Sequence, residues 1–72
     1  MKFVGRRIQH EWVVDDSGRK QWFTGSVTDV LKGKDGEKNA VYEVLYEDDN
    51  EAYEIDNLYE DFISSAVKFI DL

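Results

Sequence analysis

The feature that most constrains this chain is a two-residue alternation of apolar and polar side chains, repeated in short runs. The clearest run covers residues 6–14 and places one set of side chains on a common face: Ile8, His10, Trp12 and Val14. Such alternation is typical of a half-buried β-strand. Because the chain has only 72 residues, we expect these strands to form a single domain that spans residues 1–72.

Turn-forming residues divide the chain into further strands. Asp15–Gly18, the loop at residues 32–39 and Asp48–Asn50 are rich in Asp, Asn and Gly, which favour turns. The pattern predicts strands at residues 6–14, 20–31, 40–47, 51–55 and 66–70. Within the second strand, alternation places Phe23, Gly25, Val27 and Leu31 on one face and Trp22, Thr24, Ser26, Thr28 and Val30 on the other.

Two further signals complete the predicted fold. Leu58, Phe62 and Ile63 have helical spacing, so we expect a helical turn at residues 57–63, capped by Asp56, before the last strand. Gly25 lies inside the long second strand and favours a bend that lets this strand serve both sides of a sheet. The prediction is a small all-β, five-stranded barrel with one short helical turn.

Charge is divided unevenly along the chain. Residues 1–38 carry 8 basic and 6 acidic groups, whereas residues 39–72 carry 1 basic and 10 acidic groups, within a net charge of −7. Nucleic-acid binding depends on Lys and Arg that neutralise phosphates, so the acidic half disfavours a nucleic-acid partner and favours a basic one. The simpler alternative is a solvated acidic face that only keeps the protein in solution.

Several kinds of chemistry find no support in the residues. There is no Cys and only one His, which disfavours thiolate and multi-histidine metal sites. His10 and Glu11 alternate faces of one strand, and no Ser has a recognisable partner base. The paired acids do not have the spacing of a calcium loop, and no apolar run approaches the roughly 20 residues that span a bilayer. We therefore expect no enzyme activity, no cofactor, no metal and no membrane partner.

The aromatic residues suggest a site. In an up-and-down sheet the first and third turns lie at the same end, and four inward-facing aromatics flank those turns: Trp12, Phe23, Tyr46 and Tyr53. Acidic residues surround the same end, with Asp48, Asp49, Glu51 and Glu60 as candidates for its rim. Electron-rich ring faces attract a cation, so this arrangement suits a methylated ammonium. The alternative is that the four rings are simply core.

Trp22 and Phe23 compete for one place in this cluster. They are adjacent, so only one of them points inward unless a bulge intervenes. Trp22 shares a face with Thr24 and Ser26, which is polar. We therefore place Phe23 in the cluster and Trp22 at its rim or outside.

The order of these segments resembles a known family. The stretch Val4–Trp12 resembles the opening of a Tudor-like repeat of the spindlin type, and Gln21–Val27 is similar to the second strand of that repeat. Tyr42–Asp49 is similar to the third strand and acidic turn of Tudor domains, and Ala52–Ile55 with Leu58 is similar to the fourth strand and its exit. The resemblance covers nearly the whole chain.

The resemblance implies a fold and a function. It implies an SH3-like barrel that reads methylated lysine or arginine on a basic peptide such as a histone tail, in the nucleus, with a cage made of Trp12, Phe23, Tyr46 and Tyr53. Counting from Trp12, however, the second cage position falls on Trp22. Spindlin-type proteins usually carry three such repeats, so we expect either a monomeric stand-alone module or one repeat of a larger protein. The alternative function is an acidic barrel that docks a basic protein without reading a methyl mark.

Overall fold

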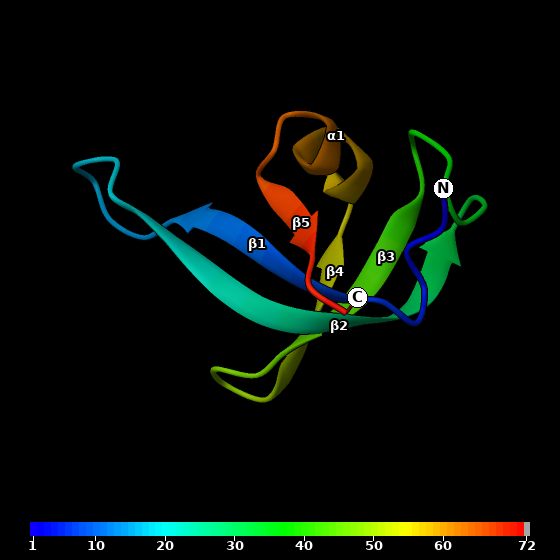
Figure 1. Cartoon of the computed structure of the whole chain (residues 1–72), viewed down its shortest axis with the longest axis horizontal. Coiled ribbons are helices and arrows are strands. Elements are labelled where there is room, and N and C mark those ends of the chain that lie inside the picture. The colour runs from blue at the N-terminus through cyan, green and yellow to red at the C-terminus, as the bar shows by residue number, and fades with distance from the viewer. Residues whose placement is uncertain (72) are drawn as a thin grey trace.

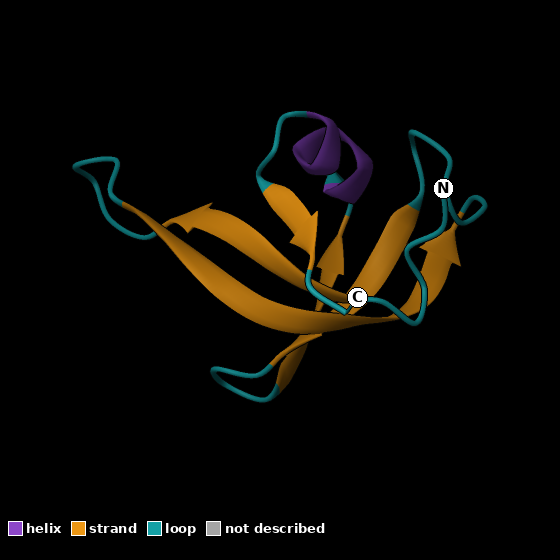
Figure 2. Cartoon of the chain, in the orientation of Figure 1, coloured by secondary structure: helices purple, strands orange, loops and turns teal. Residues whose placement is uncertain are grey.

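The first two alternating runs form a long antiparallel hairpin in the computed structural model, which describes residues 1–71 (Figures 1 and 2). Strand β1 (Arg7–Val13) pairs with β2 (Lys20–Lys32), with His10 opposite Phe23 and Ile8 opposite Gly25. The connecting turn is held by the Asp15 carboxylate, which accepts hydrogen bonds from the Ser17 side chain and the Arg19 backbone N–H. Directly opposite residues share a face, so this register fixes which side chains point inward.

The remaining elements complete one antiparallel sheet. Strands β3 (Val41–Tyr46) and β4 (Glu51–Ile55) follow on one side of β2, and β5 (Val67–Phe69) pairs with the other side of β1, which gives the order β4-β3-β2-β1-β5. Helix α1 (Leu58–Ile63) lies between β4 and β5 in the chain and packs over the concave side of the sheet (Figure 1). The predicted all-β fold with one helical turn is confirmed, with each strand end within two residues of its predicted position.

The long strand β2 joins the two sides of the sheet, as predicted from its length and from Gly25. Its first part, Lys20–Ser26, pairs with β1, and its second part, Gly25–Lys32, pairs with β3. Figure 2 shows β2 as one long, curved strand that runs across the view below β1 and β5. The curvature makes the sheet barrel-like and brings the inward side chains of all five strands together.

The core lies inside this curved sheet and beneath α1. Its fully buried side chains come from every element: Ile8, Val27, Val44, Ile55, Leu58 and Val67, together with Phe3, Ala40, Tyr42 and Tyr46. Phe3 was not predicted to be part of the core, because it precedes the first alternating run. Its backbone N–H donates to Asp35 Oδ1 at 2.7 Å, which ties the N-terminal segment to the loop between β2 and β3.

Two details of the prediction are wrong. Leu31 was placed on the inward face of β2, but it is exposed and Val30 packs against the core instead, because bulges after Val27 and after Val30 shift the alternation. Asp56 was expected to cap α1, but Asn57 occupies the N-cap position, and its side chain does not bond to the first-turn backbone.

Among residues 1–71, α1 is the only helix, and it is too short to cross a membrane.

Candidate functional site: an aromatic cage at one end of the sheet

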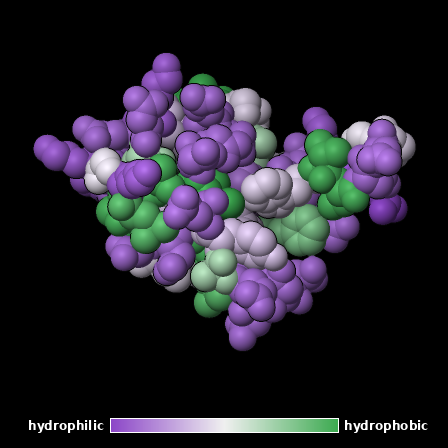
Figure 3. All heavy atoms as spheres, turned by 180° about the vertical axis from the view of Figure 1, so that it is seen from behind, coloured by the Kyte–Doolittle hydropathy of each residue, from purple (hydrophilic) through white to green (hydrophobic). Residues whose placement is uncertain are grey.

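The structure brings the four predicted cage residues into one pocket. A hollow of about 250 Å³ is lined by Trp12, Phe23, Tyr46, Tyr53, Asp48 and Asp49. The aromatic rings come from β1, β2, β3 and β4, and the two carboxylates come from the turn between β3 and β4. Viewed from behind, the surface is notched between the β1–β2 hairpin and this turn, and side chains of intermediate hydropathy gather there (Figure 3).

The rings of the cage stand as walls and not as a stack. The Trp12 and Tyr46 rings lie 6.3 Å apart at 77°, and the Tyr46 and Tyr53 rings lie 5.6 Å apart at 69°. Such edge-to-face geometry is a favourable way for rings to pack. All three rings line the same pocket, and contact with more than one ring strengthens the attraction for a cation.

The depth of the walls differs from one ring to the next. Tyr46 is 5% exposed and forms the back of the pocket, whereas Tyr53 is 45% exposed and forms its outer edge. Trp12 and Phe23 are half-buried and pack against the core. The pocket therefore has one buried wall, Tyr46, and one exposed wall, Tyr53.

Gly25 makes room for the back wall. It lies opposite Tyr46 in the β2–β3 ladder. A Cβ at this position would lie 2.9 Å from Tyr46 Cδ1 and 3.0 Å from the Leu45 carbonyl oxygen. The glycine, predicted as a point of bending, thus also permits the Tyr46 ring to lie against β2.

The acidic turn places negative charge at the mouth of the pocket. The Tyr53 hydroxyl donates to Asp49 Oδ2, and the Glu51 backbone N–H donates to Asp49 Oδ1 at 3.0 Å. The bond from Tyr53 lowers the pKa of Asp49, and the same contact raises the pKa of Tyr53. Asn50 adopts a left-handed conformation with φ of 55°, which closes the turn. Asp49 is therefore ionised at neutral pH and fixed beside the outer cage wall.

The other predicted rim residues lie outside the lining of the pocket. Glu51 is exposed opposite Tyr46 and on the same face, just beyond the cage, whereas Glu60 is exposed on α1. Trp22 faces the outside of the sheet, and the Lys68 ammonium lies 4.4 Å from the centre of its ring. Phe23, and not Trp22, lines the pocket with Trp12, Tyr46 and Tyr53.

A second, polar hollow adjoins the cage on the outer side of β2. It is lined by Gln21, Trp22, Phe23, Thr24, Glu47 and Asp48, so that Phe23 and Asp48 border both spaces. Glu47 forms an ion pair with Arg7 across this surface. The surface beside the cage is therefore acidic and polar. Two of its side chains already contact cations of the chain: Glu47 pairs with Arg7, and the Trp22 ring lies against Lys68.

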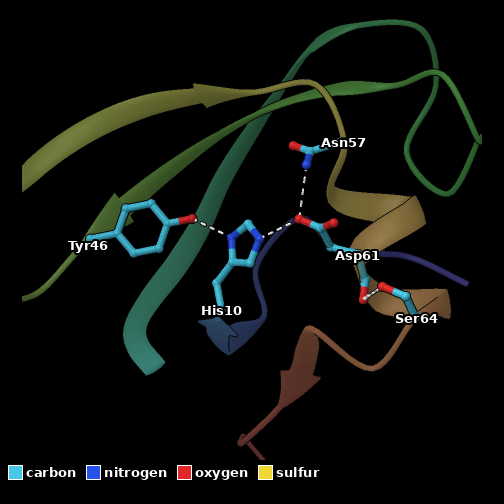
Figure 4. Close-up of polar contacts among 5 residues, drawn as sticks. All are labelled: His10, Tyr46, Asn57, Asp61 and Ser64. Carbon is cyan, nitrogen blue, oxygen red and sulfur yellow. Dashed lines mark hydrogen bonds and ion pairs between the residues drawn. The ribbon is translucent and has the colours of Figure 1, made fainter. Parts of the chain in front are cut away.

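A buried polar network supports the cage from behind. His10 lies between the Tyr46 hydroxyl and the Asp61 carboxylate, and Asn57 Nδ2 also donates to Asp61 at 3.0 Å (Figure 4). His10 is completely buried in this network. Asp61 was missed, although its position three residues after the buried Leu58 places it on the inward side of α1.

Within residues 1–71, no group of three or more His, Cys, Asp or Glu side chains is placed to hold a metal ion.

The chain matches no family model, and no curated protein or solved structure matches it.

Proposed function

We propose that this domain is a non-catalytic reader that binds a methylated lysine or arginine side chain in the aromatic cage. The observation that carries the proposal is one pocket in which four aromatic walls and two carboxylates converge. Rings attract a cation by about 0.5–2 kcal/mol per contact, depending on desolvation. Methylation removes hydrogen-bond donors from the ammonium, which makes its transfer from water to an apolar box less costly.

The size of the pocket supports a side chain as the ligand. Its volume of about 250 Å³ lies below the roughly 300–1,000 Å³ of pockets that enclose drug-sized molecules. One alkylammonium or alkylguanidinium head is a better match for this space than a whole metabolite. The rest of the ligand would then lie on the surface outside the pocket.

The charge of the chain supports a basic peptide around the methylated residue. Asp48 and Asp49 line the mouth, and Glu47 and Glu51 flank the same turn. A peptide rich in Lys and Arg is attracted by this field, which raises its association rate at low salt. Such a peptide has the character of a histone tail, and a nuclear, chromatin-associated role as a Tudor-like, spindlin-type module would follow from it.

The test is a titration with two forms of one basic peptide, trimethylated and unmethylated at a central lysine. We expect the trimethylated form to bind more tightly. Tyr53→Ala should weaken its binding by about 1–2 kcal/mol, a factor of about 5–30, because one wall is lost. The matched control is Trp22→Ala, which removes a neighbouring aromatic outside the cage and should leave the ratio of the two affinities unchanged.

The alternative function predicts a different pattern. If the domain only docks basic proteins through its acidic face, both peptides bind equally and the affinity falls with salt in the same way for each. Equal affinities, or a methyl preference that survives Tyr53→Ala in a folded protein, would show that the rings are not a reading site.

A further inference from the structure

A buried histidine lies directly behind the cage. His10 is completely inaccessible to solvent, and its ring centre lies 4.5 Å from that of Trp12. Its Nδ1 lies 2.8 Å from the Tyr46 hydroxyl, and its Nε2 lies 2.6 Å from Asp61 Oδ2. Figure 4 shows the imidazole between these two partners. One side chain thus contacts two cage walls and α1.

The donors and acceptors of this network are matched when the histidine is neutral. Burial raises the pKa of Tyr46 well above its usual range, and the carboxylate of Asp61 adds to this effect, so the phenol keeps its proton. With His10 neutral and protonated at Nε2, the Tyr46 hydroxyl donates to His10 Nδ1 and His10 Nε2–H donates to Asp61. A doubly protonated imidazole has two donors and no acceptor. Protonation would therefore force the buried Tyr46 hydroxyl to give up its acceptor.

The surroundings of His10 contain two titratable side chains. Asp61 is the acidic group that faces it from α1, and Tyr46 faces it from β3. The residues opposite His10 in β2 and β5 are Phe23 and Val67, which carry no charge. Burial lowers the pKa of His10, and this effect outweighs the opposing contribution of Asp61. The imidazole is accordingly neutral at neutral pH.

We propose that His10 is a positioning residue for the cage, and that a proton on His10 and a methylated cation in the cage each weaken the binding of the other. This inference rests on the proposed function. There are two reasons for the antagonism. A protonated His10 reverses the hydrogen bond that fixes the back wall, Tyr46. It also places a positive charge directly behind two rings that must attract a second positive charge.

Thermodynamic reciprocity gives the inference a second, independent signature. If protonation of His10 weakens ligand binding, then ligand binding must lower the pKa of His10 by the equivalent amount. A change of half to one pKa unit corresponds to about three- to tenfold in affinity. Both quantities are measurable on the intact domain.

The experiment measures the affinity of an N-acetylated, histidine-free Gly/Arg peptide with one central trimethyllysine, from about pH 8 to about pH 5. The charge of trimethyllysine does not change with pH, and His10 is the only histidine of the chain. Carboxylates ordinarily titrate near pH 4. We expect the affinity to fall about three- to tenfold toward acid pH, and NMR to show a lower His10 pKa when the peptide is bound.

Two variants separate positioning from a general structural role. His10→Gln keeps an acceptor for the Tyr46 hydroxyl but cannot titrate, so its affinity should stay flat over this pH range. Asp61→Asn removes the carboxylate that favours the imidazolium, so the fall in affinity should move to lower pH. Circular dichroism at each pH verifies folding, because a lowered His10 pKa also reduces stability as the pH drops below the ordinary value of about 6.5.

The outcomes of this experiment are distinct from those of the titration that tests the reader function. If the trimethylated peptide has no advantage over the unmethylated one at pH 8, the reader function itself fails. If the methyl preference holds at pH 8 but the affinity is independent of pH, or His10→Gln follows the same pH curve as the parent, the reader function stands and the role of His10 is overturned.

Discussion

Strand β3 supplies a tyrosine to each of two aromatic clusters, and only one of these clusters is open. The cage contains Tyr46, and a second group, here called the sealed cluster, contains Phe3, Tyr42, Phe62 and Phe69, whose rings pack 5.0–5.6 Å apart. Both tyrosines point inward and lie four residues apart, about 13 Å along the strand. The two clusters share strand β3, yet one is a pocket and the other is core.

The difference arises from what covers each cluster. Phe3 enters the sealed cluster and is completely buried there. Asp35 holds Phe3 in place. Its carboxylate accepts hydrogen bonds from the backbone N–H groups of Phe3 and Val4 and from the Tyr42 hydroxyl. At the cage, the neighbouring chain is an acidic turn that ends beside the rings without covering them. The N-terminal segment therefore covers the sealed cluster, and none of its residues lines the cage.

Removal of the Phe3 side chain should produce the largest loss of stability. Phe3→Ala deletes a fully buried aromatic side chain and should reduce the free energy of unfolding by about 3–5 kcal/mol. Tyr53→Ala, in the open cluster, should cost less than about 1 kcal/mol, because nearly half of that side chain is already in water. Urea denaturation of both variants measures the contrast. Equal losses of stability would mean that the cage rings are as much a part of the core as Phe3.

Replacement of Asp35, whose carboxylate holds Phe3 in place, should cause the next largest loss of stability. Burial of Asp35 opposes its ionisation, but the hydrogen bonds from Phe3, Val4 and Tyr42 outweigh burial and lower its pKa. Asp35→Asn places an amide donor opposite one of these N–H groups and should cost about 1.5–3 kcal/mol at neutral pH. Asp35 stabilises the fold above its ordinary pKa of about 3.9, and this contribution is lost as the pH falls through the lower folded value.

Denaturation at a series of pH values tests this prediction. The difference in stability between the parent and Asp35→Asn should begin to shrink below about pH 4, where the unfolded chain binds a proton at Asp35. It should be smallest below the lower folded pKa, where Asp35 is neutral in both states. A difference that persists unchanged at low pH would mean that the shape of the side chain matters and its charge does not.

A third substitution tests the close contact between Gly25 of β2 and the Tyr46 ring of the cage. Gly25→Ala places a methyl group against the Tyr46 ring and the Leu45 carbonyl, and such crowding costs about 1–3 kcal/mol. Because the displaced ring is the back wall, binding of a trimethyllysine peptide should fall together with stability. The matched control is Ser26→Ala, which alters the next residue of the same strand and should change stability by less than about 0.5 kcal/mol. Unaltered binding by Gly25→Ala would show that Tyr46 has room to move without loss of the cage.

The comparison of the two clusters also explains which parts of the molecule the sequence predicted. Alternation and turn residues predicted the strands and the inward direction of the cage rings, because both are local properties of a pleated backbone. The burial of Phe3 was not predicted, because Phe3 belongs to no alternating run and its partner Asp35 is 32 residues away. Leu31 was misplaced because bulges in β2 depend on pairing with β3 and leave no mark in the composition of the strand.

The polar network behind the cage, formed by His10 and Asp61, could be predicted only in part from the sequence. The spacing of Leu58 and Phe62 identifies the inward side of α1, and Asp61 lies on that side. Its contact with His10, 51 residues away, could not be predicted, because it depends on how the helix packs over the sheet. Local periodicity thus predicted the walls of the candidate site, whereas tertiary packing determined what holds them.

The smallest effect should come from the hydroxyl of the outer wall. Tyr53→Phe removes the bond to Asp49 but keeps the ring, and both partners are exposed, so stability should change by less than about 0.5 kcal/mol. If the ring face carries the attraction for the cation, the affinity for a trimethyllysine peptide should stay within about twofold of the parent, in contrast to the loss expected for Tyr53→Ala. Calorimetric titration of the two variants under the same buffer makes the comparison. A loss in Tyr53→Phe as large as that in Tyr53→Ala would mean that Asp49 must hold the ring at its 69° angle to Tyr46, and that the open cluster, like the sealed one, depends on a carboxylate to fix its geometry.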